Sequence, residues 1–525
     1  MALVTATADS CKDDLSRVVR SSQSARTVRA CLLATRDRDQ ALTLLKEVAS
    51  GVSRPLYHFT MADRRRFNPT RLQWEAVGGE SGNTASLLRT AQELRGGGIV
   101  AVEDVLSSLR PESANSPARM TLAHMLSAET DSEGLVLVFI EPPEAEAALP
   151  SMLADQFVRL SVPYPRASEL EIMTREELAA LAHRSGVALP VERIQQEAKR
   201  LSTGLGGLTR SAARDALRDA LAPNLRDFHA AAEQLQRRKA QHLQRELSMN
   251  ILDATAEEEP IGLDYLVDHL TSCRNRMRVI GPGRAKGVLL IGPPGTGKTI
   301  LARAIGKLVG LPVVEFRIAA LMNSLLGETE RRFAQAFATL EAMAPNVVFI
   351  DEIEKAFGDS SERDGGTMMR CTGALLSWLS DNPYPNFIVA TSNSLQRMGE
   401  IGLTMTRSER FDAGFFVDVP NCEARRRMLN RWLVGLMVDH EEVSSALADL
   451  SDKFSGADLR SVVKQAQTYA ESANVPFTVD VLKTCLERKR MRAIALYDEF
   501  QELRRWGRLH CDPAGPAEGE KSRVG

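Results

Sequence analysis

The stretch of sequence that decides the fold is Gly292-Pro293-Pro294-Gly295-Thr296-Gly297-Lys298-Thr299. It matches the pattern G-x-x-x-x-G-K-[ST] in full, follows the apolar run Gly287–Ile291 and precedes a helical pattern at 300–308. Glycines let a backbone turn and point its N–H groups at phosphate oxygens, and a helix N-terminus adds a partial positive charge. We therefore expect Lys298 to reach the β- and γ-phosphates of ATP and the Thr299 hydroxyl to bind Mg²⁺. A glycine-rich turn without a ligand is the disfavoured alternative.

Polar residues end two further apolar runs. Asp351 and Glu352 follow the run at 347–350, and Asn393 closely follows the run at 387–390. Side chains at the carboxyl ends of parallel strands lie at the edge of the sheet where ligands bind. We expect Asp351 to hold Mg²⁺ through water and Glu352 to activate the attacking water. Asn393 is expected to contact that water or the γ-phosphate, although asparagine at such a position also serves simply as a turn residue.

The pattern around these motifs is that of an α/β protein. Short apolar runs alternate with helix-period segments from 287 to about 417, and only helical patterns follow as far as about 492. The first half repeats this order, with five candidate strands between 30 and 160 and then helices. Two copies of one architecture, a mostly parallel sheet followed by helices, are therefore expected.

The first half has no phosphate loop. Its first candidate strand continues into Thr35-Arg36-Asp37-Arg38-Asp39, without the glycines or the Lys-Thr pair. The carboxylates of this segment would repel phosphate. Glu103 and Asp104 resemble the acidic pair of the second half, and we interpret them as a relic or as surface residues. This half is expected to be structural or to bind a partner.

Composition limits the other possibilities. The formal net charge of −2 gives no overall basic field for nucleic acid. No apolar run approaches the roughly 20 residues of a membrane helix. The seven cysteines are scattered and form no CxxC pair, so neither a disulfide framework nor a zinc site is expected. A cytoplasmic location is the default expectation.

The motifs together resemble the AAA clade of AAA+ ATPases. The order GPPGTGKT, VVFIDE, ATSN and then RSERFD is characteristic of that family. The resemblance implies that Arg407 and Arg410 are arginine fingers that reach the γ-phosphate of a neighbouring subunit, and hence a homo-oligomer, a hexameric ring. It also places Ile261 and Gly262 against the adenine, and Gly456, which begins a lid helix, near the adenine and ribose.

Two departures from the family pattern are present. The substrate-gripping pore loop of the family carries an aromatic residue where this chain has Leu325. The Pro-Gly pair between the two arginines is Ser408-Glu409 here, which alters the expected finger geometry. Within the clade, DEIEKAF, GGT and LSWLS resemble the tandem-domain AAA proteins of the Ycf type, which occur in algal chloroplast genomes, cyanobacteria and other bacteria.

These observations predict a P-loop NTPase (AAA+) parallel sheet with a C-terminal helical lid, preceded by a degenerate AAA-like α/β module with its own helical region. The expected domains are 1–165, the degenerate module; 166–259, a helical region and linker; 260–420, the ATPase core; 421–495, the lid; and 496–525, a C-terminal extension that is disordered from Asp512 onward.

Three functions are compatible with this organisation. The first is an oligomeric ATPase that remodels a protein partner. The second is a slow ATP-dependent switch or scaffold that binds partners through the N-terminal half without threading them, which the leucine at 325 favours. Nucleic-acid handling is third, because the charge balance is neutral and no DNA-binding motif is present. The identity of the protein partner is not encoded in these motifs.

Overall fold

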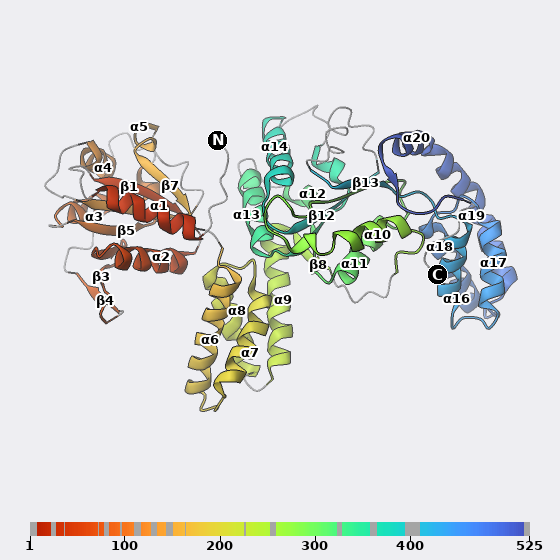
Figure 1. The fold of residues 1–525 in the computed structure, drawn as a ribbon, viewed down its shortest axis with the longest axis horizontal. Coiled ribbons are helices and arrows are strands. Elements are labelled where there is room, and N and C mark those ends of the chain that lie inside the picture. Colours follow the sequence, from red (N-terminus) through yellow and green to blue (C-terminus); the bar gives the residue numbers. More distant parts are fainter. Residues whose placement is uncertain are drawn as a thin grey trace. The chain divides into compact units, whose positions relative to one another are not determined.

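The computed structural model describes residues 8–22, 28–35, 37–71, 73–77, 83–94, 97–109, 117–127, 134–142, 151–162, 164–224, 227–252, 259–322, 328–357, 365–393 and 410–518. The chain divides into two compact units, Met1–Lys239 and Ala240–Gly525, which we call unit 1 and unit 2. Each contains a sheet flanked by helices and a group of helices that follows it in the sequence (Figure 1).

Unit 1 is built on a seven-stranded sheet of order β4-β3-β2-β5-β6-β1-β7. Its strands are β1 (Arg29–Ala34), β2 (Leu56–Phe59), β3 (Arg64–Asn68), β4 (Gln73–Ala76), β5 (Gly98–Glu103), β6 (Leu135–Glu141) and β7 (Phe157–Ser161). Its helices are α1 (Ala8–Ser21), α2 (Arg38–Gly51), α3 (Thr84–Gln92), α4 (Pro117–Ser127), α5 (Ser151–Ala154), α6 (Ala167–Arg184), α7 (Val191–Ser202), α8 (Arg210–Asn224) and α9 (Phe228–Leu247), which runs on into unit 2.

Unit 2 has a seven-stranded sheet of order β14-β13-β9-β12-β11-β10-β8. Its strands are β8 (Met249–Leu252), β9 (Gly287–Ile291), β10 (Val313–Phe316), β11 (Asn346–Ile350), β12 (Asn386–Ser392), β13 (Ala413–Phe416) and β14 (Asp512–Pro513). Its helices are α10 (Asp264–Cys273), α11 (Lys298–Val309), α12 (Ile318–Met322), α13 (Glu328–Ala342), α14 (Gly365–Asp381), α16 (Cys422–Leu433), α17 (His440–Leu450), α18 (Gly456–Ala473), α19 (Val479–Glu499) and α20 (Gln501–His510).

The two sheets share one arrangement of five parallel strands. In unit 1 the order is β2-β5-β6-β1-β7, and in unit 2 it is β10-β11-β12-β9-β13, with every neighbouring pair parallel. The corresponding strands occur in the same order along the chain. The expected α/β fold and its duplication are therefore confirmed, and unit 1 is a second module of the same architecture.

Buried apolar side chains explain why these runs form strands inside the sheets. Alternate residues of β1 enter two different cores, Leu32 on one face and Leu33 on the other. In unit 2, Leu289 and Leu290 of β9 divide in the same way. Strands buried on both faces need continuous apolar runs, which is the pattern that the sequence contains.

The helices α16–α19, which we call the lid, have a separate apolar core that includes Leu429, Leu447 and Leu459. The structure differs from expectation at the C-terminal extension. Asp512–Glu518 is ordered: Asp512 and Pro513 form β14 beside β13, so the expectation of disorder there was wrong. Residues 519–525 lie outside the described residues. Among the described residues, no helix is long and apolar enough to span a membrane.

Candidate nucleotide site

The loop between β9 and α11 requires glycine at three positions. Gly295 and Gly297 have φ angles of +81° and +93°, which residues with a side chain rarely adopt. A Cβ at Gly292 would lie 2.1 Å from the carbonyl oxygen of Val417, so the backbones approach too closely for any side chain. Gly297 is also the N-cap of α11 and provides no side chain to cap it. The first amides of α11 therefore remain available to an external acceptor.

Lys298 is the first residue of α11, and its side chain folds back over the loop. Its Nζ donates to the carbonyl oxygens of Gly292 (2.8 Å) and Pro293 (2.7 Å). The side chain is buried, and this desolvation lowers the pKa of the ammonium to about 8, against the opposing effect of nearby carboxylates, of which Asp351 is the strongest. Thr296 closes the same loop by donating from Oγ1 to Pro293 at 3.0 Å.

The carboxyl ends of β9, β12 and β11 bring the acidic residues next to this loop. The Thr299 hydroxyl lies 3.5 Å from Oδ2 of Asp351, which follows β11. On the other side, the Thr391 hydroxyl of β12 donates to Oδ1 of Asp351 at 2.5 Å and accepts the backbone N–H of Glu352 at 2.9 Å. Thr391 thus fixes both acidic residues. Thr391 is not among the residues predicted from the sequence, although its place in a strand between β9 and β11 is a usable signal.

Glu352 occupies a strained turn. Its φ is +50°, an uncommon value for a residue with a side chain. Its carboxylate forms an ion pair with Lys355 and lies 3.4 Å from the Asn393 amide nitrogen. The backbone N–H of Asn393 donates to Glu354 at 2.9 Å. These contacts bring Glu352 and Asn393 together.

The side-chain oxygen of Asn393 is buried and has no hydrogen-bond partner among the described residues. Buried polar atoms are normally satisfied, so this acceptor fits a water or ligand group beside Glu352. No cluster of three metal-binding side chains occurs among the described residues. Thr299 and Asp351 alone suit Mg²⁺, which commonly takes one or two protein ligands together with substrate phosphates.

The lid also contacts the phosphate loop. Ser455 caps α18 in a capping box with Asp458, and the N–H of Ala457 donates to the carbonyl oxygen of Gly295 at 3.1 Å. Gly456 lies within van der Waals distance of both Gly295 and Met428, because a Cβ there would be 3.9 Å and 3.7 Å from them. Gly456 therefore lies beside the phosphate loop and lines the cavity, and its expected place near the adenine and ribose stays a prediction.

A cavity of about 770 Å³ joins these parts. Its lining includes the loop together with Asp351, Glu352 and Asn393. It also includes the apolar side chains of Ile261 and of Met428 and Trp432 of α16, three residues that we call its apolar end. Polar groups together with an apolar surface match the two parts of a nucleotide. Gly262, whose φ is +79°, follows Ile261 in the chain but does not line the cavity.

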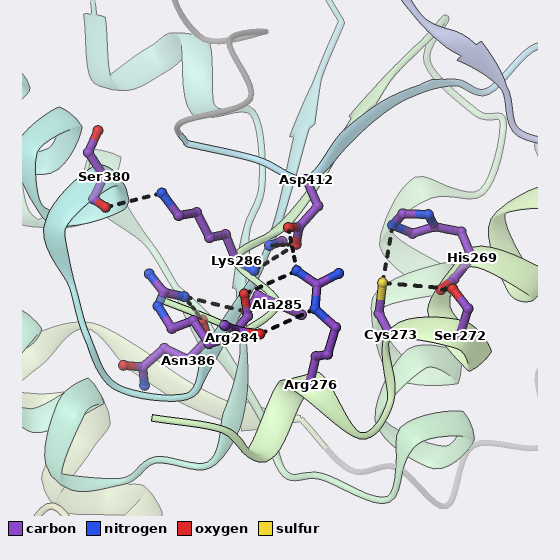
Figure 2. Close-up of polar contacts among 12 residues, drawn as sticks. His269, Ser272, Cys273, Arg276, Arg284, Ala285, Lys286, Ser380, Asn386 and Asp412 are labelled. Atoms are coloured by element: carbon purple, nitrogen blue, oxygen red, sulfur yellow. Dashed lines mark hydrogen bonds and ion pairs between the residues drawn. The ribbon is translucent and has the colours of Figure 1, made fainter. Parts of the chain in front are cut away.

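The arginine segment is only partly described. Arg407 lies outside the described residues, as does Leu325 of the expected pore loop. Arg410 is half-buried and does not line the cavity of its own unit. Phe411 is buried, and Oδ2 of Asp412 accepts the backbone N–H groups of Lys286 (2.6 Å) and Gly287 (3.0 Å), which precede the phosphate loop by one strand (Figure 2).

A polar network surrounds this anchor. Arg276 approaches Oδ1 of Asp412 at 3.5 Å, and Lys286 donates through Nζ to the carbonyl oxygen of Ser380 (Figure 2). The buried Arg284 donates to the carbonyl oxygens of Asn382 and Asn386 at 2.7 Å and 3.2 Å. These bonds join the starts of β9, β12 and β13, so the segment that follows Arg410 is attached to a rigid edge of the sheet.

The equivalent position in unit 1 is closed by the protein itself. Three residues, 35–37, join β1 to α2, compared with six, 292–297, between β9 and α11. The buried carboxylate of Asp37 caps α2 by accepting the N–H of Gln40 at 3.1 Å, and it also accepts the N–H of Ser211, at the start of α8, at 3.0 Å. An internal carboxylate thus occupies the helix N-terminus that meets the phosphate loop in unit 2.

The acidic pair of unit 1 likewise has partners within the unit. Glu103 is 2% exposed and lies 2.6 Å from Nε of Arg38 and 2.7 Å from His58, so it is not a surface residue. Asp104 pairs with Arg38 at 3.1 Å. Its φ of +55° is close to the +50° of Glu352, so the backbone turn is preserved where the acids differ in order.

Residues 288–419 match the profile of the family described as ATPase family associated with various cellular activities (AAA). An AAA domain-containing protein named ycf46 from Trieres chinensis is 33% identical over 251 residues, covering 46% of this chain and 48% of that protein. The ycf46 protein of Guillardia theta is 26% identical over 370 residues, covering 69% and 71% of the two chains. Spastin of Drosophila melanogaster is 33% identical over 229 residues, covering 42% of this chain and 29% of spastin.

Proposed function

For a chain that belongs to the AAA+ ATPases and is similar to the ycf46 proteins, we propose that unit 2 binds ATP with Mg²⁺ and hydrolyses it to ADP and phosphate. The observation that carries this proposal is the meeting of three groups in the lining of the cavity. These are the open N-terminus of α11, the Thr299–Asp351 pair and the Glu352–Asn393 pair.

Binding is assigned to the loop and its lysine. The loop 292–297 and the first amides of α11 receive the phosphates, and Lys298 exchanges its two loop carbonyl acceptors for phosphate oxygens. Thr299 and Asp351 would hold Mg²⁺, which when bound neutralises charge on the phosphates. Ile261, Met428 and Trp432 form the apolar end that accepts the adenine.

Hydrolysis is assigned to Glu352. Its carboxylate accepts a proton from the attacking water and orients it, and the Asn393 side chain provides a second contact to that water or to the γ-phosphate. Two features support the assignment. The Thr391 bond holds the backbone of Glu352, and the buried Asn393 oxygen lies beside it without a partner among the described residues.

The proposal is tested with Glu352→Gln, which keeps the shape of the side chain and removes the base. We expect ATP affinity within about twofold of the unaltered protein and turnover reduced by about 100-fold or more. Glu442→Gln, at an exposed position of α17, is the matched control and should leave both quantities unchanged. Turnover within about tenfold in Glu352→Gln would mean that another group activates the water.

We further propose that the active form is a ring of copies of this chain. Arg410 does not line the cavity of its own unit, which fits an arginine that acts on a neighbour. Arg407→Ala should then bind ATP normally and lose turnover by about 10³-fold or more. Mixing it with Lys298→Ala should restore part of the activity, because some interfaces then combine an intact lysine with an intact finger. A protein that keeps a constant turnover per subunit across a wide dilution series and stays monomeric with ATP bound would contradict the ring.

The cycle of such a ring would remodel a protein partner. The alternative is a slow ATP-dependent switch that holds partners through unit 1 without threading them. One observation favours the alternative: unit 1 has its phosphate position filled by Asp37, which suits a docking module. Glu352→Gln used as a trap captures the partner, and the unaltered protein, loaded with that partner, then separates the two accounts. A remodeller releases a bound partner on ATP turnover and leaves it unfolded, whereas a switch releases it folded.

A further inference from the structure

The C-terminal segment Cys511–Glu518, which we call the strap, has a fixed starting point. It follows α20, in which the buried Arg504 donates to Asp418 at 2.8 Å and stacks on the ring of Tyr497. A Cβ at Gly507 would lie 2.1 Å from the ring of Phe416, so α20 packs directly on β13. The strap therefore leaves a helix that is held tightly against the sheet of unit 2.

The strap next follows the edge of the sheet. Asp512 and Pro513 pair in parallel with Phe415 and Phe416, and the N–H of Ala514 donates to the carbonyl oxygen of Phe416 at 3.0 Å. The carbonyl oxygen of Ala514 accepts the N–H of Leu266, in the first turn of α10, at 3.1 Å. Ala514 is buried in the core that also contains Leu266.

The strap then reaches the segment at the apolar end of the cavity. A Cβ at Gly515 would lie 1.9 Å from the carbonyl oxygen of Gly262, so the two backbones are in direct contact. On its other side Gly262 faces the lid, because a Cβ there would lie 2.7 Å from Cβ of Ala424 in α16. Gly262 is thus held between the strap and the lid, and Ile261, which lines the cavity, precedes it.

The end of the strap binds the start of α16. Asn421, which caps α16 through its side-chain oxygen, donates from Nδ2 to the carbonyl oxygens of Pro516 (3.1 Å) and Ala517 (3.2 Å). The Glu518 carboxylate accepts the N–H of Cys422 at 3.1 Å and pairs with Arg425 at 3.4 Å. Arg425 is 3% exposed, and its next carboxylate, Asp452, is 4.0 Å away, so Glu518 is its nearer counter-charge.

The strap thus contacts both segments whose side chains form the apolar end of the cavity. One segment contains Ile261, and the other, α16, contains Met428 and Trp432. No residue of the strap lines the cavity. We propose that the strap is a positioning element of the nucleotide site: through Gly515 and Glu518 it fixes the spacing between Ile261 and α16, and so sets the affinity for the adenine part of ATP without touching it. This inference rests on the proposed function.

The test compares ligands with and without a base in the full chain. Dissociation constants for ATP, ADP and inorganic tripolyphosphate are measured by displacement of a fluorescent ADP analogue. In Gly515→Ala, the added methyl group forces the strap and Gly262 apart, and we expect ATP and ADP affinity to fall about tenfold. Tripolyphosphate affinity should stay within about twofold, because the phosphate loop is unchanged. Under turnover conditions, KM should rise while kcat at saturation is retained.

Two further variants make the comparison specific. Glu518→Ala removes only the lid contact and should weaken ATP binding about threefold. Gly414→Ala is the matched control, because it adds the same methyl group on β13 beside the strap, where its nearest neighbour, Sγ of Cys511, is at an ordinary 3.7 Å. It should bind all three ligands normally. Unchanged ATP affinity in Gly515→Ala, an equal loss for tripolyphosphate, or an equal loss in Gly414→Ala would each overturn the inference.

Failure of the proposed function gives a different result. If the unaltered protein binds neither ATP nor tripolyphosphate, the site assignment itself is wrong. The coupling between the strap and the segments that it contacts is then tested by hydrogen exchange, because the N–H groups of Leu266 and Cys422 donate to the strap. Gly515→Ala should accelerate exchange at both amides relative to Gly414→Ala, and equal rates would contradict the coupling.

Discussion

Units 1 and 2 place the same five parallel strands in the same order and differ in what meets the helix after the first strand. In unit 2, Gly297 caps α11 without a side chain, so the amides are open to phosphate. In unit 1, Asp37 caps α2 with a buried carboxylate that also reaches α8. The two units therefore share one strand arrangement and differ in the group that meets this helix N-terminus. A helix N-terminus favours an anion, and either a nucleotide or a carboxylate of the chain itself can supply it.

A second difference between the units lies on the neighbouring strand, β6 in unit 1 and β12 in unit 2. In unit 1, the register of β5 with β6 pairs Glu103 with Ile140. In unit 2, the register of β11 with β12 pairs Ile350 with Ala390, so the next residues along the two strands, Asp351 and Thr391, correspond to each other. Ile140 therefore stands in unit 1 where Thr391 stands in unit 2. Thr391 holds Asp351 and Glu352 with its hydroxyl, and isoleucine has no group for that purpose.

The largest effect among the tests of this comparison is expected from Thr391→Val, which gives unit 2 the apolar character of unit 1 at this position. The loss of the hydroxyl releases Asp351 and the backbone of Glu352, so we expect hydrolysis to fall about 10- to 100-fold. ATP affinity, measured by calorimetry, should stay within about threefold, because Lys298 and the loop are intact. Thr391→Ser keeps the hydroxyl and should retain most of the activity. Equal losses in both variants would remove Thr391 from its positioning role.

The second test concerns Asp37. Its carboxylate accepts two backbone N–H groups that would otherwise remain unpaired in a buried place. Asp37→Ala should lower the free energy of unfolding of unit 1 by about 1–3 kcal/mol. Urea unfolding of the segment 1–239 measures this, with Asp155→Ala, at an exposed turn, as the control. An unchanged midpoint would show that Asp37 does not hold α2 and α8 together.

The smallest expected effect is the uptake of a proton by Lys298 when ATP binds. Burial lowers the pKa of Lys298 to about 8 in the free protein, and phosphate oxygens favour its charged form. Above pH 8 the free protein has partly lost this proton, so ATP binding takes it up again and affinity falls as the pH rises. Calorimetry in two buffers of different ionisation enthalpy should detect almost no uptake at pH 6.5 and a clear fraction of a proton at pH 9. Equal uptake at both values would contradict the lowered pKa.

Local signals in the sequence were sufficient for much of this account. The octad at 292–299 and the apolar runs specify their own strand–loop–helix geometry, and β9 has the bounds expected from the sequence. Thr391 was overlooked because its role depends on the order of strands rather than on its neighbours in the chain.

Long-range contacts account for the other differences. The tail after Asp512 has the Pro/Gly/Glu-rich composition of a disordered segment, yet Gly515 is the residue that permits its contact with Gly262, 253 positions earlier. The sequence predicts that the carboxylate of Asp37 repels phosphate, but the bond of Asp37 to Ser211, 174 positions later, has no local signature.

The central claim is that one of the two similar modules binds nucleotide. The most direct measurement is the stoichiometry of ATP binding to the full chain by equilibrium dialysis with Mg²⁺ present. We predict one ATP per chain for the unaltered protein and none for Lys298→Ala, with Lys307→Ala, an exposed lysine of the same helix, binding normally. Two ATP molecules per chain, or one retained by Lys298→Ala, would contradict the account.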